Sequence, residues 1–199
     1  MGKTLKIACQ MDPIDRIDIR GDSTFAILLE ARHRGHEIFY YTPQNLSLHG
    51  NRLLARGSTL DVFDRIGDHY GLSNPRTVDL LTQDVVLLRQ DPPFDMAYIT
   101  STHLLERIHP ETLVVNDPGH VRNAPEKIWV LDFLDLMPPT LVTRSLEDVH
   151  AFRAEYRDII LKPLYGNGGA SVFRIKAEDT NLGSLVELFQ TVFRETFMV

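Results

Sequence analysis

The sequence predicts an α/β protein in which a domain built on a parallel sheet is followed by a smaller α+β segment. Three observations lead to this prediction. The chain opens with a strand–helix–strand pattern over residues 5–41, an almost uninterrupted apolar run covers Asp84–Leu88, and a glycine-rich loop near residue 166 has strand patterns on both sides. A strand that is buried on both faces of a parallel sheet shows such a continuous apolar run.

Composition places the chain among ordinary globular proteins. Its 199 residues are 43% hydrophobic and 24% charged, and the formal net charge of −6 argues against a nucleic-acid partner. The N-terminus shows no long apolar run, which argues against a signal peptide and a membrane span. Cys9 is the only cysteine, so no disulfide can form within the chain, as expected for a cytoplasmic protein. Its apolar neighbours predict a buried small residue rather than a nucleophile.

The first part of the chain alternates between strands and helices. Apolar strands are predicted over Leu5–Met11 and Glu37–Tyr41, and the helix between them begins after the N-cap pair Asp22-Ser23 and ends at Gly35. Because the first strand–helix turn lacks a glycine fingerprint, this Rossmann-like opening resembles a dinucleotide-binding domain without its phosphate site. Residues 65–74 are polar and show no clear element.

Arg89 and Asp91 follow the carboxyl end of the predicted central strand Asp84–Leu88. Ligands bind at this end of the strands in open α/β sheets. A helix from about residue 95 to residue 108 and a strand over residues 112–116 follow. An Asp-Pro step by itself only favours a turn, but three such steps at one edge of a sheet predict a shared rim. The three strand ends that finish in this way are Asp12-Pro13, Asp91-Pro92 and Asp117-Pro118.

After residue 122 the pattern changes to shorter elements. The elements predicted there are, in order, an aromatic–apolar helix around residues 128–134, a strand over residues 140–143, a helix capped by Ser145, an amphipathic helix from Asn181 and a strand over residues 196–199.

The stretch Ile159–Lys176 carries the strongest chemical signal. It runs from an apolar strand ending in Lys162 through Gly166, Gly168 and Gly169 into the alternating residues VFRIK. Glycines let backbone N–H groups lie against an anion, and Lys162 adds a full positive charge. A Walker loop and a dinucleotide fingerprint both open a helix, whereas β-branched and aromatic residues follow this loop. The pattern therefore favours a hairpin that folds over a nucleoside triphosphate. A surface hairpin whose glycines serve only the turn is the alternative.

Several stretches together resemble the bacterial glutathione synthetases, which are ATP-grasp ligases. The stretches are MDPI, DSTFAILLEARHRGHE, LLRQDPPFDMAYI, LVVNDP, RNAPEK, TLVTR and IILKPLYGNGGASVFRIK, and they span essentially the whole chain. The resemblance implies an N-terminal pre-ATP-grasp substrate domain over residues 1–122. It also implies the first part of an ATP-grasp domain over residues 123–199.

No side chain is expected to act as a nucleophile or base, because forming an acyl phosphate requires charge neutralisation and alignment instead. Position by position, the resemblance implies two sets of binding residues. The residues expected to bind the peptide substrate are Arg89, Asp91, Asp12 and Ser23. The residues expected to bind ATP are Lys127, Lys162, Gly166, Asn167, Gly168, Gly169, Ala170 and Ser171.

The resemblance also implies a reaction. ATP would phosphorylate the C-terminal carboxylate of γ-glutamylcysteine, and the amine of glycine would attack the acyl phosphate to give glutathione, ADP and phosphate. Family members continue into a second ATP-grasp subdomain whose carboxylate and asparagine side chains hold two Mg²⁺ ions. No metal ligand is therefore expected within this chain, and the chain alone is expected to have little or no activity. A cytoplasmic homo-oligomer is expected, and the resemblance suggests a tetramer.

Two other interpretations fit parts of the sequence. Another ATP-grasp peptide ligase, such as a dipeptide or glutamate ligase, would share Lys127, Lys162 and the loop but not the RQDPPFD block. A truncated chain could instead serve as a non-catalytic nucleotide-binding or interaction module. A metal hydrolase has little support, because the eight histidines are scattered and His33 and His36 flank a helix end.

Overall fold

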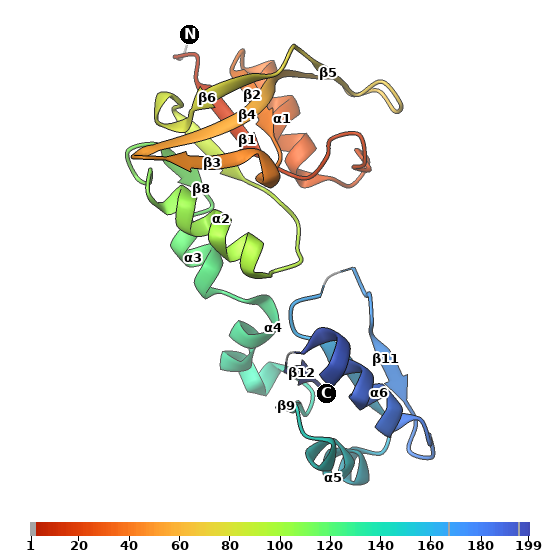
Figure 1. The fold of residues 1–199 in the computed structure, drawn as a ribbon. Helices are drawn as coiled ribbons and strands as arrows, with labels where there is room; N and C mark the ends of the chain where they lie inside the picture. Colours follow the sequence, from red (N-terminus) through yellow and green to blue (C-terminus); the bar gives the residue numbers. More distant parts are fainter. Residues whose placement is uncertain (1–2, 167, 195) are drawn as a thin grey trace. The chain divides into compact units, whose positions relative to one another are not determined.

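Two compact units make up the structure, which is a computed structural model describing residues 3–166, 168–194 and 196–199. The N-terminal unit contains the chain up to Asp91 together with Met96–Asn123, and the C-terminal unit contains Pro92–Asp95 together with Ala124–Val199. In the colours of Figure 1, the N-terminal unit runs from red to green and the C-terminal unit runs on to blue. Each unit has its own sheet and its own hydrophobic core.

A mixed sheet forms the centre of the N-terminal unit. Its parallel part has the order β2-β1-β7-β8. The register pairs Cys9 of β1 with Tyr40 on one side and with Leu87 on the other. The predicted central parallel strand is confirmed, since β7 lies between β1 and β8. The bounds of these strands are Lys6–Gln10 for β1, Glu37–Tyr41 for β2, Val85–Leu88 for β7 and Leu113–Val115 for β8.

Antiparallel strands extend this sheet beyond β2. The long strand β4 pairs with β2, β3, β5 and β6, so this half of the sheet is joined through it. Residues 65–74, in which the sequence shows no clear element, contain a strand that is defined only by its pairing with β4. The bounds are Leu46–His49 for β3, Arg52–Val62 for β4, Tyr70–Leu72 for β5 and Arg76–Asp79 for β6.

Helices cover both faces of the parallel strands, as in a Rossmann-like domain (Figure 1). Because neighbouring residues of a strand point to opposite faces, β1 supplies both cores. Ile7 and Cys9 pack against α1, whereas Ala8 belongs to the core that contains residues of α2. The bounds are Ser23–His33 for α1, Met96–Glu106 for α2 and Pro118–Asn123 for α3, with short 3-10 turns η1 at Pro43–Asn45 and η2 at Leu80–Thr82.

The C-terminal unit is an antiparallel sheet with the order β11-β10-β12-β9. β10 and β11 form the hairpin that the sequence predicts around the glycine loop, and β12 is the predicted C-terminal strand. Among the described residues of both units, no helix combines the length and apolar character needed to cross a membrane. The bounds are Val142–Thr143 for β9, Leu146–Tyr156 for α5, Ile159–Pro163 for β10, Phe173–Ile175 for β11, Leu182–Leu188 for α6, Phe189–Phe193 for the π-helical turn η4 and Phe197–Met198 for β12.

Successive side chains of β10 point alternately to the two faces of the sheet, which places its buried residues on one face and Lys162 on the other. Ile159 and Leu161 are buried in a core with residues of α5 and α6. Ile160 and Lys162 occupy the alternate positions and are more exposed. Because successive side chains of a strand point to opposite faces, Lys162 lies on the face of β10 that the core does not occupy.

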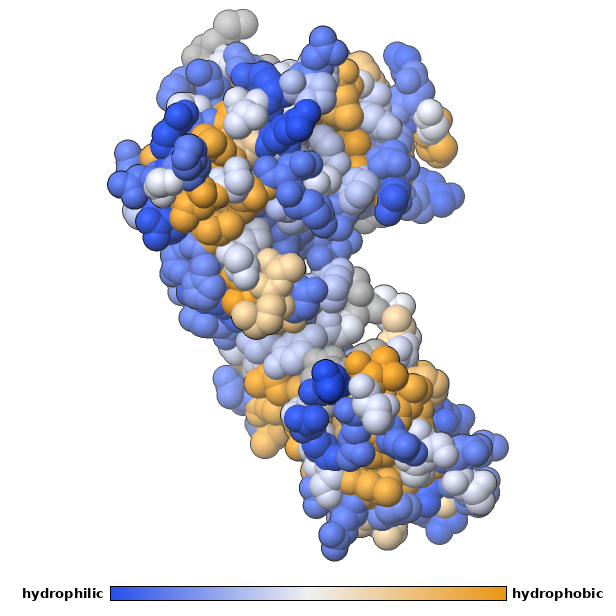
Figure 2. Space-filling view, viewed as in Figure 1, coloured by the Kyte–Doolittle hydropathy of each residue, from blue (hydrophilic) through white to orange (hydrophobic). Residues whose placement is uncertain are grey.

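The predicted aromatic–apolar helix around residues 128–134 is wrong as a continuous element. A short helix α4 (Glu126–Trp129) is followed by the 3-10 segment η3 (Val130–Leu136), in which Phe133 has the non-helical angles φ −121° and ψ 46°. Trp129, Phe133 and Leu134 are exposed, and Figure 2 shows hydrophobic surface over this segment. An apolar stripe that is not packed into a core gains little from helical regularity, because tertiary packing supplies most helical stability.

Gly57 stands where β4 passes close to β2. A Cβ at this position would lie 2.0 Å from the backbone oxygen of Tyr40 and 2.9 Å from the Cβ of Tyr41. We expect Gly57→Ala to lower the free energy of unfolding of the N-terminal unit by about 1–3 kcal/mol, the usual cost of overpacking. Gly21→Ala is the matched control, since nothing lies within 4 Å of a Cβ at that position.

The reactivity of the Cys9 thiol can be used to measure unfolding of the N-terminal unit and so to test this prediction. Its side chain is fully buried, as the sequence predicts, and burial raises the pKa of the thiol to about 12. The folded unit therefore protects it from thiol reagents, which react with exposed thiolates. Labelling of Cys9 across a urea series reports the unfolding of this unit. An unfolding midpoint that Gly57→Ala leaves unchanged would contradict the close approach of β2 and β4.

Candidate functional site

Three strands of the N-terminal unit end side by side at one edge of its sheet. Because β1, β7 and β8 are parallel neighbours, Asp12, Asp91 and Asp117 follow their carboxyl ends at the same edge, as the sequence predicts. Asp12 Oδ2 accepts a hydrogen bond from the Asp91 backbone N–H at 2.6 Å. Asp117 belongs to a separate group, with His109 Nε2 at 3.2 Å and His120 Nδ1 at 3.4 Å. The rim thus holds two groups, and the first contains the predicted site residues.

Arg89 reaches from the end of β7 to the first turn of α1. Its Nε–H donates to Thr24 Oγ1 at 3.0 Å, and its Nη2 donates to Ser23 Oγ at 2.7 Å. α1 begins here because the Asp22 side chain accepts a hydrogen bond from the Phe25 N–H at 2.6 Å, which confirms the predicted N-cap. The predicted residues Arg89 and Ser23 are therefore in contact. Thr24 was not among the predicted site residues, although its place beside Ser23 in the first helical turn was a usable signal.

The surroundings of Arg89 are acidic. Partial desolvation raises the pKa of the Asp91 carboxyl above its usual range, and the charges of Asp12 and Asp22 raise this pKa further, while Arg89 acts in the opposite direction. Desolvation also raises the pKa of the Tyr98 hydroxyl, on which the same arginine and the Asp91 and Asp12 carboxylates act. The carboxyl groups of Asp12, Asp22 and Asp91 therefore stand near one another at this edge of the sheet, with Arg89 as a nearby positive charge.

A buried amide network holds the chain between Arg89 and Asp91. Gln10, at the end of β1, is fully buried, and its Nε2 donates to Gln90 Oε1 and to Ser101 Oγ, the latter at 2.7 Å. The Gln10 Oε1 atom has no hydrogen-bond partner among the residues that the structure describes. This network was not predicted, because glutamine is usually a surface residue and nothing in the local pattern marks the buried Gln10 and the partly buried Gln90 as partners.

The glycine loop joins β10 to β11 in the C-terminal unit. Gly168 and Gly169 have φ values of +60° and +76°, which side chains with a Cβ rarely adopt. Gly166 is needed for a different reason, since a Cβ there would lie 2.9 Å from Pro163 Cγ. Ser171 also has a positive φ, of 58°, so the loop closes with some backbone strain.

Two lysines converge on this loop. Lys127, on α4, donates from Nζ to the Gly166 carbonyl oxygen at 2.6 Å, and its side chain is only 16% exposed. Lys162, on β10, lines the same pocket of about 190 Å³. Of the residues expected to bind ATP, Ser171 does not line this pocket and Asn167 lies outside the described residues. The remaining lining residues are Glu126, Pro163, Gly166, Gly168, Gly169, Ala170 and Val172.

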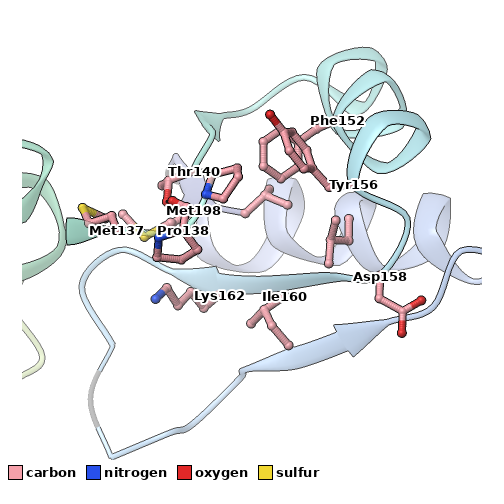
Figure 3. A pocket seen from close by; sticks show the side chains of 12 residues that line it. Met137, Pro138, Thr140, Phe152, Tyr156, Asp158, Ile160, Lys162 and Met198 are labelled. Carbon is pink, nitrogen blue, oxygen red and sulfur yellow. The ribbon is translucent and has the colours of Figure 1, made fainter. Parts of the chain in front are cut away.

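Lys162 also lines a second and larger pocket, of about 380 Å³. Most of its lining side chains are apolar, and they come from the segment before β9, from α5, from β10 and from β12 (Figure 3). In Figure 3 the Lys162 amino group points along β10, away from Asp158. This pocket was not predicted, because four separate segments of the chain line it. Its lining includes Pro138, Phe152, Tyr156, Ile160 and Met198.

Metal ligands are not gathered in this part of the protein. Within residues 3–166, 168–194 and 196–199, no group of three or more histidine, cysteine, aspartate or glutamate side chains is placed to hold a metal ion.

Two family models match the chain one after the other. The model for the N-terminal domain of prokaryotic glutathione synthetase matches residues 5–122, and the model for the ATP-grasp domain of the same enzyme matches residues 126–199.

Curated relatives agree with these matches. Glutathione synthetase from Rhodopseudomonas palustris is 61% identical over 196 residues, which are 98% of this chain. The glutathione synthetases of Agrobacterium fabrum and Escherichia coli O6:H1 are 57% and 45% identical, over 100% and 92% of this chain. The chain spans 63%, 62% and 58% of the length of these three relatives.

Solved structures of lower identity show the fold. D-cycloserine synthetase DcsG superposes with a TM-score of 0.59 at 18% identity, covering 96% of this chain and 57% of that protein. An ATP-grasp RimK domain protein from Sphaerobacter thermophilus gives 0.57 at 20% identity, covering 97% and 62%. The predicted α/β architecture, with a Rossmann-like domain followed by the first part of an ATP-grasp fold, is confirmed. With both family models matching in order along almost all of its length, the chain belongs to the prokaryotic glutathione synthetase family.

Proposed function

We propose that the chain forms the dipeptide-binding part and the first ATP-binding part of an ATP-dependent glutathione synthetase. The reaction joins γ-glutamylcysteine to glycine through an acyl phosphate and releases ADP and phosphate. One observation carries this proposal beyond family membership: two lysines and three glycines line a single pocket at the β10–β11 hairpin. This combination suits a polyphosphate, which needs cations and closely approaching backbone N–H groups.

The charges of this pocket support a polyanionic ligand. Lys127 and Lys162 line this pocket together with Glu126, whose Oε1 lies 3.8 Å from the Lys127 Nζ, so the lining carries two positive charges and one negative charge. The bond to the Gly166 carbonyl places Lys127 against the loop. We assign Lys127, Lys162 and the Gly166–Ser171 loop to the phosphates of ATP.

The pocket beyond Lys162 supports a nucleotide rather than free phosphate. Its apolar lining offers a place for a flat base, while the glycine-lined pocket offers a place for phosphates. Lys162 lines both pockets. Its ammonium group would therefore contact the phosphates of a nucleotide whose base lies in the apolar pocket beside β10.

We assign the peptide substrate to the rim of the N-terminal unit. Arg89 and Asp91 supply the charges there, and Ser23 orients the arginine. Asp12 acts mainly as a positioning residue, because its carboxylate accepts the Asp91 N–H. Since the described residues give Mg²⁺ no cluster of ligands, no step of the reaction is assigned to a metal in this chain. The homo-oligomer and the cytoplasmic location stay predictions.

Release of ADP tests the proposed function. The chain is mixed with ATP, γ-glutamylcysteine and glycine, and ADP is measured against mixtures in which D-alanine or glutamate pairs replace these substrates. Slow release that requires γ-glutamylcysteine and glycine supports the proposal. Release with another pair identifies a different ATP-grasp ligase. A melting temperature that ATP raises, without ADP release from any pair, identifies a nucleotide-binding module.

Lys162→Ala should weaken ATP and ADP binding by a factor of about 10²–10³, because removing one preorganised electrostatic group costs roughly 3–4 kcal/mol. Isothermal titration calorimetry measures this affinity. Lys176→Ala removes an exposed lysine from the same unit and serves as the control, with little expected change. Equal nucleotide affinity in Lys162→Ala and the unmodified chain would refute the phosphate assignment.

Lys127→Met should loosen the glycine loop even without nucleotide. The substitution removes a hydrogen bond from a largely buried charged donor to the Gly166 carbonyl, a bond worth about 1.5–3 kcal/mol. We expect faster hydrogen exchange at the loop amides of residues 168–172, measured by mass spectrometry, and unchanged exchange in β1 and β2. Exchange at the loop that matches the Lys176→Met control would show that this contact does not hold the loop.

A further inference from the structure

We propose that the N-terminal unit has a second small-molecule site, at the amino ends of its parallel strands, which binds a free acidic amino acid. Lys6 and Glu37 bind the α-carboxylate and the α-ammonium group of this ligand, and Arg76 binds its side-chain carboxylate. The site lies at the opposite edge of the sheet from the rim that holds Arg89, and the inference does not depend on the proposed function.

A pocket of about 360 Å³, which we call the amino-edge pocket, lies at this edge of the sheet. Lys6 and Glu37 are the first residues of β1 and β2, and the register makes them direct neighbours. Arg89, in contrast, follows the last residue of β7. The volume is in the range of pockets that hold small molecules. The strand residues on which the argument depends are Lys6, Glu37, Phe39, Thr59, Arg76 and Val78.

The side chains of these strand residues point to one face of the sheet. Residues two apart on a strand share a face, and Thr59 pairs directly with Phe39. Each charged residue stands two positions before a buried member of the core that contains residues of α2. These pairs are Lys6 and Ala8, Glu37 and Phe39, and Arg76 and Val78. The three charged side chains therefore project from the same face, toward the same pocket.

The connection from β6 to β7 closes the pocket over this face. β6 pairs with β4 and β7 pairs with β1, so the connection has to pass over the strands between them. Leu80 of this connection is buried in the same core, and Thr82 and Gln83 line the pocket. The buried Thr112 hydroxyl donates to the Leu80 carbonyl oxygen at 3.1 Å and lies 3.3 Å from that of Gln83. This wall of the pocket is therefore fixed to the rest of the unit.

The three charged side chains of the pocket are not neutralised by the protein. Among the described residues, none of them has an oppositely charged group within 4.0 Å. The nearby acids already have partners. Asp84 accepts from Lys3 Nζ at 2.6 Å and from the Lys6 backbone N–H at 2.8 Å, and Asp79 accepts from Arg52 Nε at 2.8 Å. The pocket lining thus offers two positive charges and one negative charge to a ligand.

Neutral groups position the Arg76 guanidinium. Its central carbon lies 5.4 Å from the centroid of the Phe39 ring, which is a cation–π contact. Its Nη2 lies 3.5 Å from Thr59 Oγ1. Neither group removes the positive charge, so the remaining N–H groups are available to a carboxylate, which a guanidinium binds through two parallel hydrogen bonds.

Charge and spacing together indicate an acidic amino acid. The order β1-β2-β4-β6 separates the backbones of Lys6 and Arg76 by three strand spacings, or about 14 Å. Both side chains are long, so the gap between their charged ends is much shorter and suits two carboxylates joined by a short aliphatic chain. Glu37 stands directly beside Lys6, which matches an ammonium group next to one of the carboxylates. Apolar Phe39 and Val78 lie along the path between the ends.

Ligand analogues test the proposal on the unmodified chain by isothermal titration calorimetry. Glutarate lacks the ammonium group of L-glutamate, 4-aminobutanoate lacks its α-carboxylate and L-2-aminobutanoate lacks its side-chain carboxylate. We expect each to bind at least about tenfold more weakly than L-glutamate, because a charged group of the site stays unpaired. No binding of L-glutamate, or equal affinity for any of the three analogues, overturns the proposal. Tighter binding of glutathione than of L-glutamate would overturn the assignment to a free amino acid.

Hydrogen exchange measured by mass spectrometry locates the bound ligand. L-Glutamate should slow exchange at the amides of residues 80–84, which close the amino-edge pocket, and leave residues 89–91 at the opposite edge unchanged. Protection of residues 89–91 without protection of residues 80–84 would place the ligand at the rim and overturn the proposal.

Two variants assign the charges of the ligand to residues. Arg76→Gln should weaken L-glutamate at least about tenfold and leave L-2-aminobutanoate nearly unchanged, because this analogue has no side-chain carboxylate to lose. Glu37→Gln should weaken L-glutamate in the same way and leave glutarate nearly unchanged. Arg65→Gln and Glu30→Gln are the controls of equal charge change, since both residues are exposed and ion-paired elsewhere in the unit. An equal loss for L-glutamate and its analogue would reduce the residue to a structural role and overturn its assignment.

Protection of Cys9 from thiol labelling shows whether each variant is folded. If Arg76→Gln exposes Cys9, the analogue series and the exchange measurement on the unmodified chain still decide the proposal.

Discussion

The two-residue period of β10 is the constraint on which the chemistry of the C-terminal unit depends. Ile159 and Leu161 must face the core, since they pack there with Val149 of α5 and Val186 of α6. Once these positions are fixed, Lys162 has to lie on the opposite face. A shift of register by one residue would bury the ammonium group, which costs far more than a strand of this length can supply. The hydrophobic core thereby places the charge beside the glycine loop.

Both units bring charged side chains together at their candidate sites. In the C-terminal unit, Lys127 and Lys162 border one pocket, in which the Glu126 Oε1 lies 3.8 Å from the Lys127 Nζ. In the N-terminal unit, hydroxyls hold Arg89, and the Asp91 carboxylate stands near two further carboxylates. Such groups of charged side chains are typical of functional sites. ATP, the ligand proposed for the C-terminal unit, is a polyanion and would bring charge of the opposite sign to the two lysines.

Much of this organisation could be predicted from the residues. The parallel strand at residues 84–88, the cap at Asp22, the buried Cys9 and the hairpin around the glycine loop are all confirmed, because each is a local pattern with a strong physical cause. The helix at residues 128–134 was mispredicted for the opposite reason. Its apolar residues suggested burial, but Trp129 and Leu134 are exposed and the helix breaks at Phe133. An apolar pattern shows that a segment can be buried, and it does not show what would bury it.

The sequence by itself determined the order of strands and helices, the glycine loop with its lysine, and the charged residues at the strand ends. These follow from side-chain periodicity and from the conformations that glycine and proline allow, which act over a few residues. Only the tertiary structure decided that Thr24 holds Arg89, that Asp12 holds Asp91, that Lys127 reaches Gly166 and that Gln10 joins Gln90. Each of these contacts links residues from 39 to 80 positions apart. Their geometry depends on how strands pair and helices pack, and no local pattern of residues encodes it.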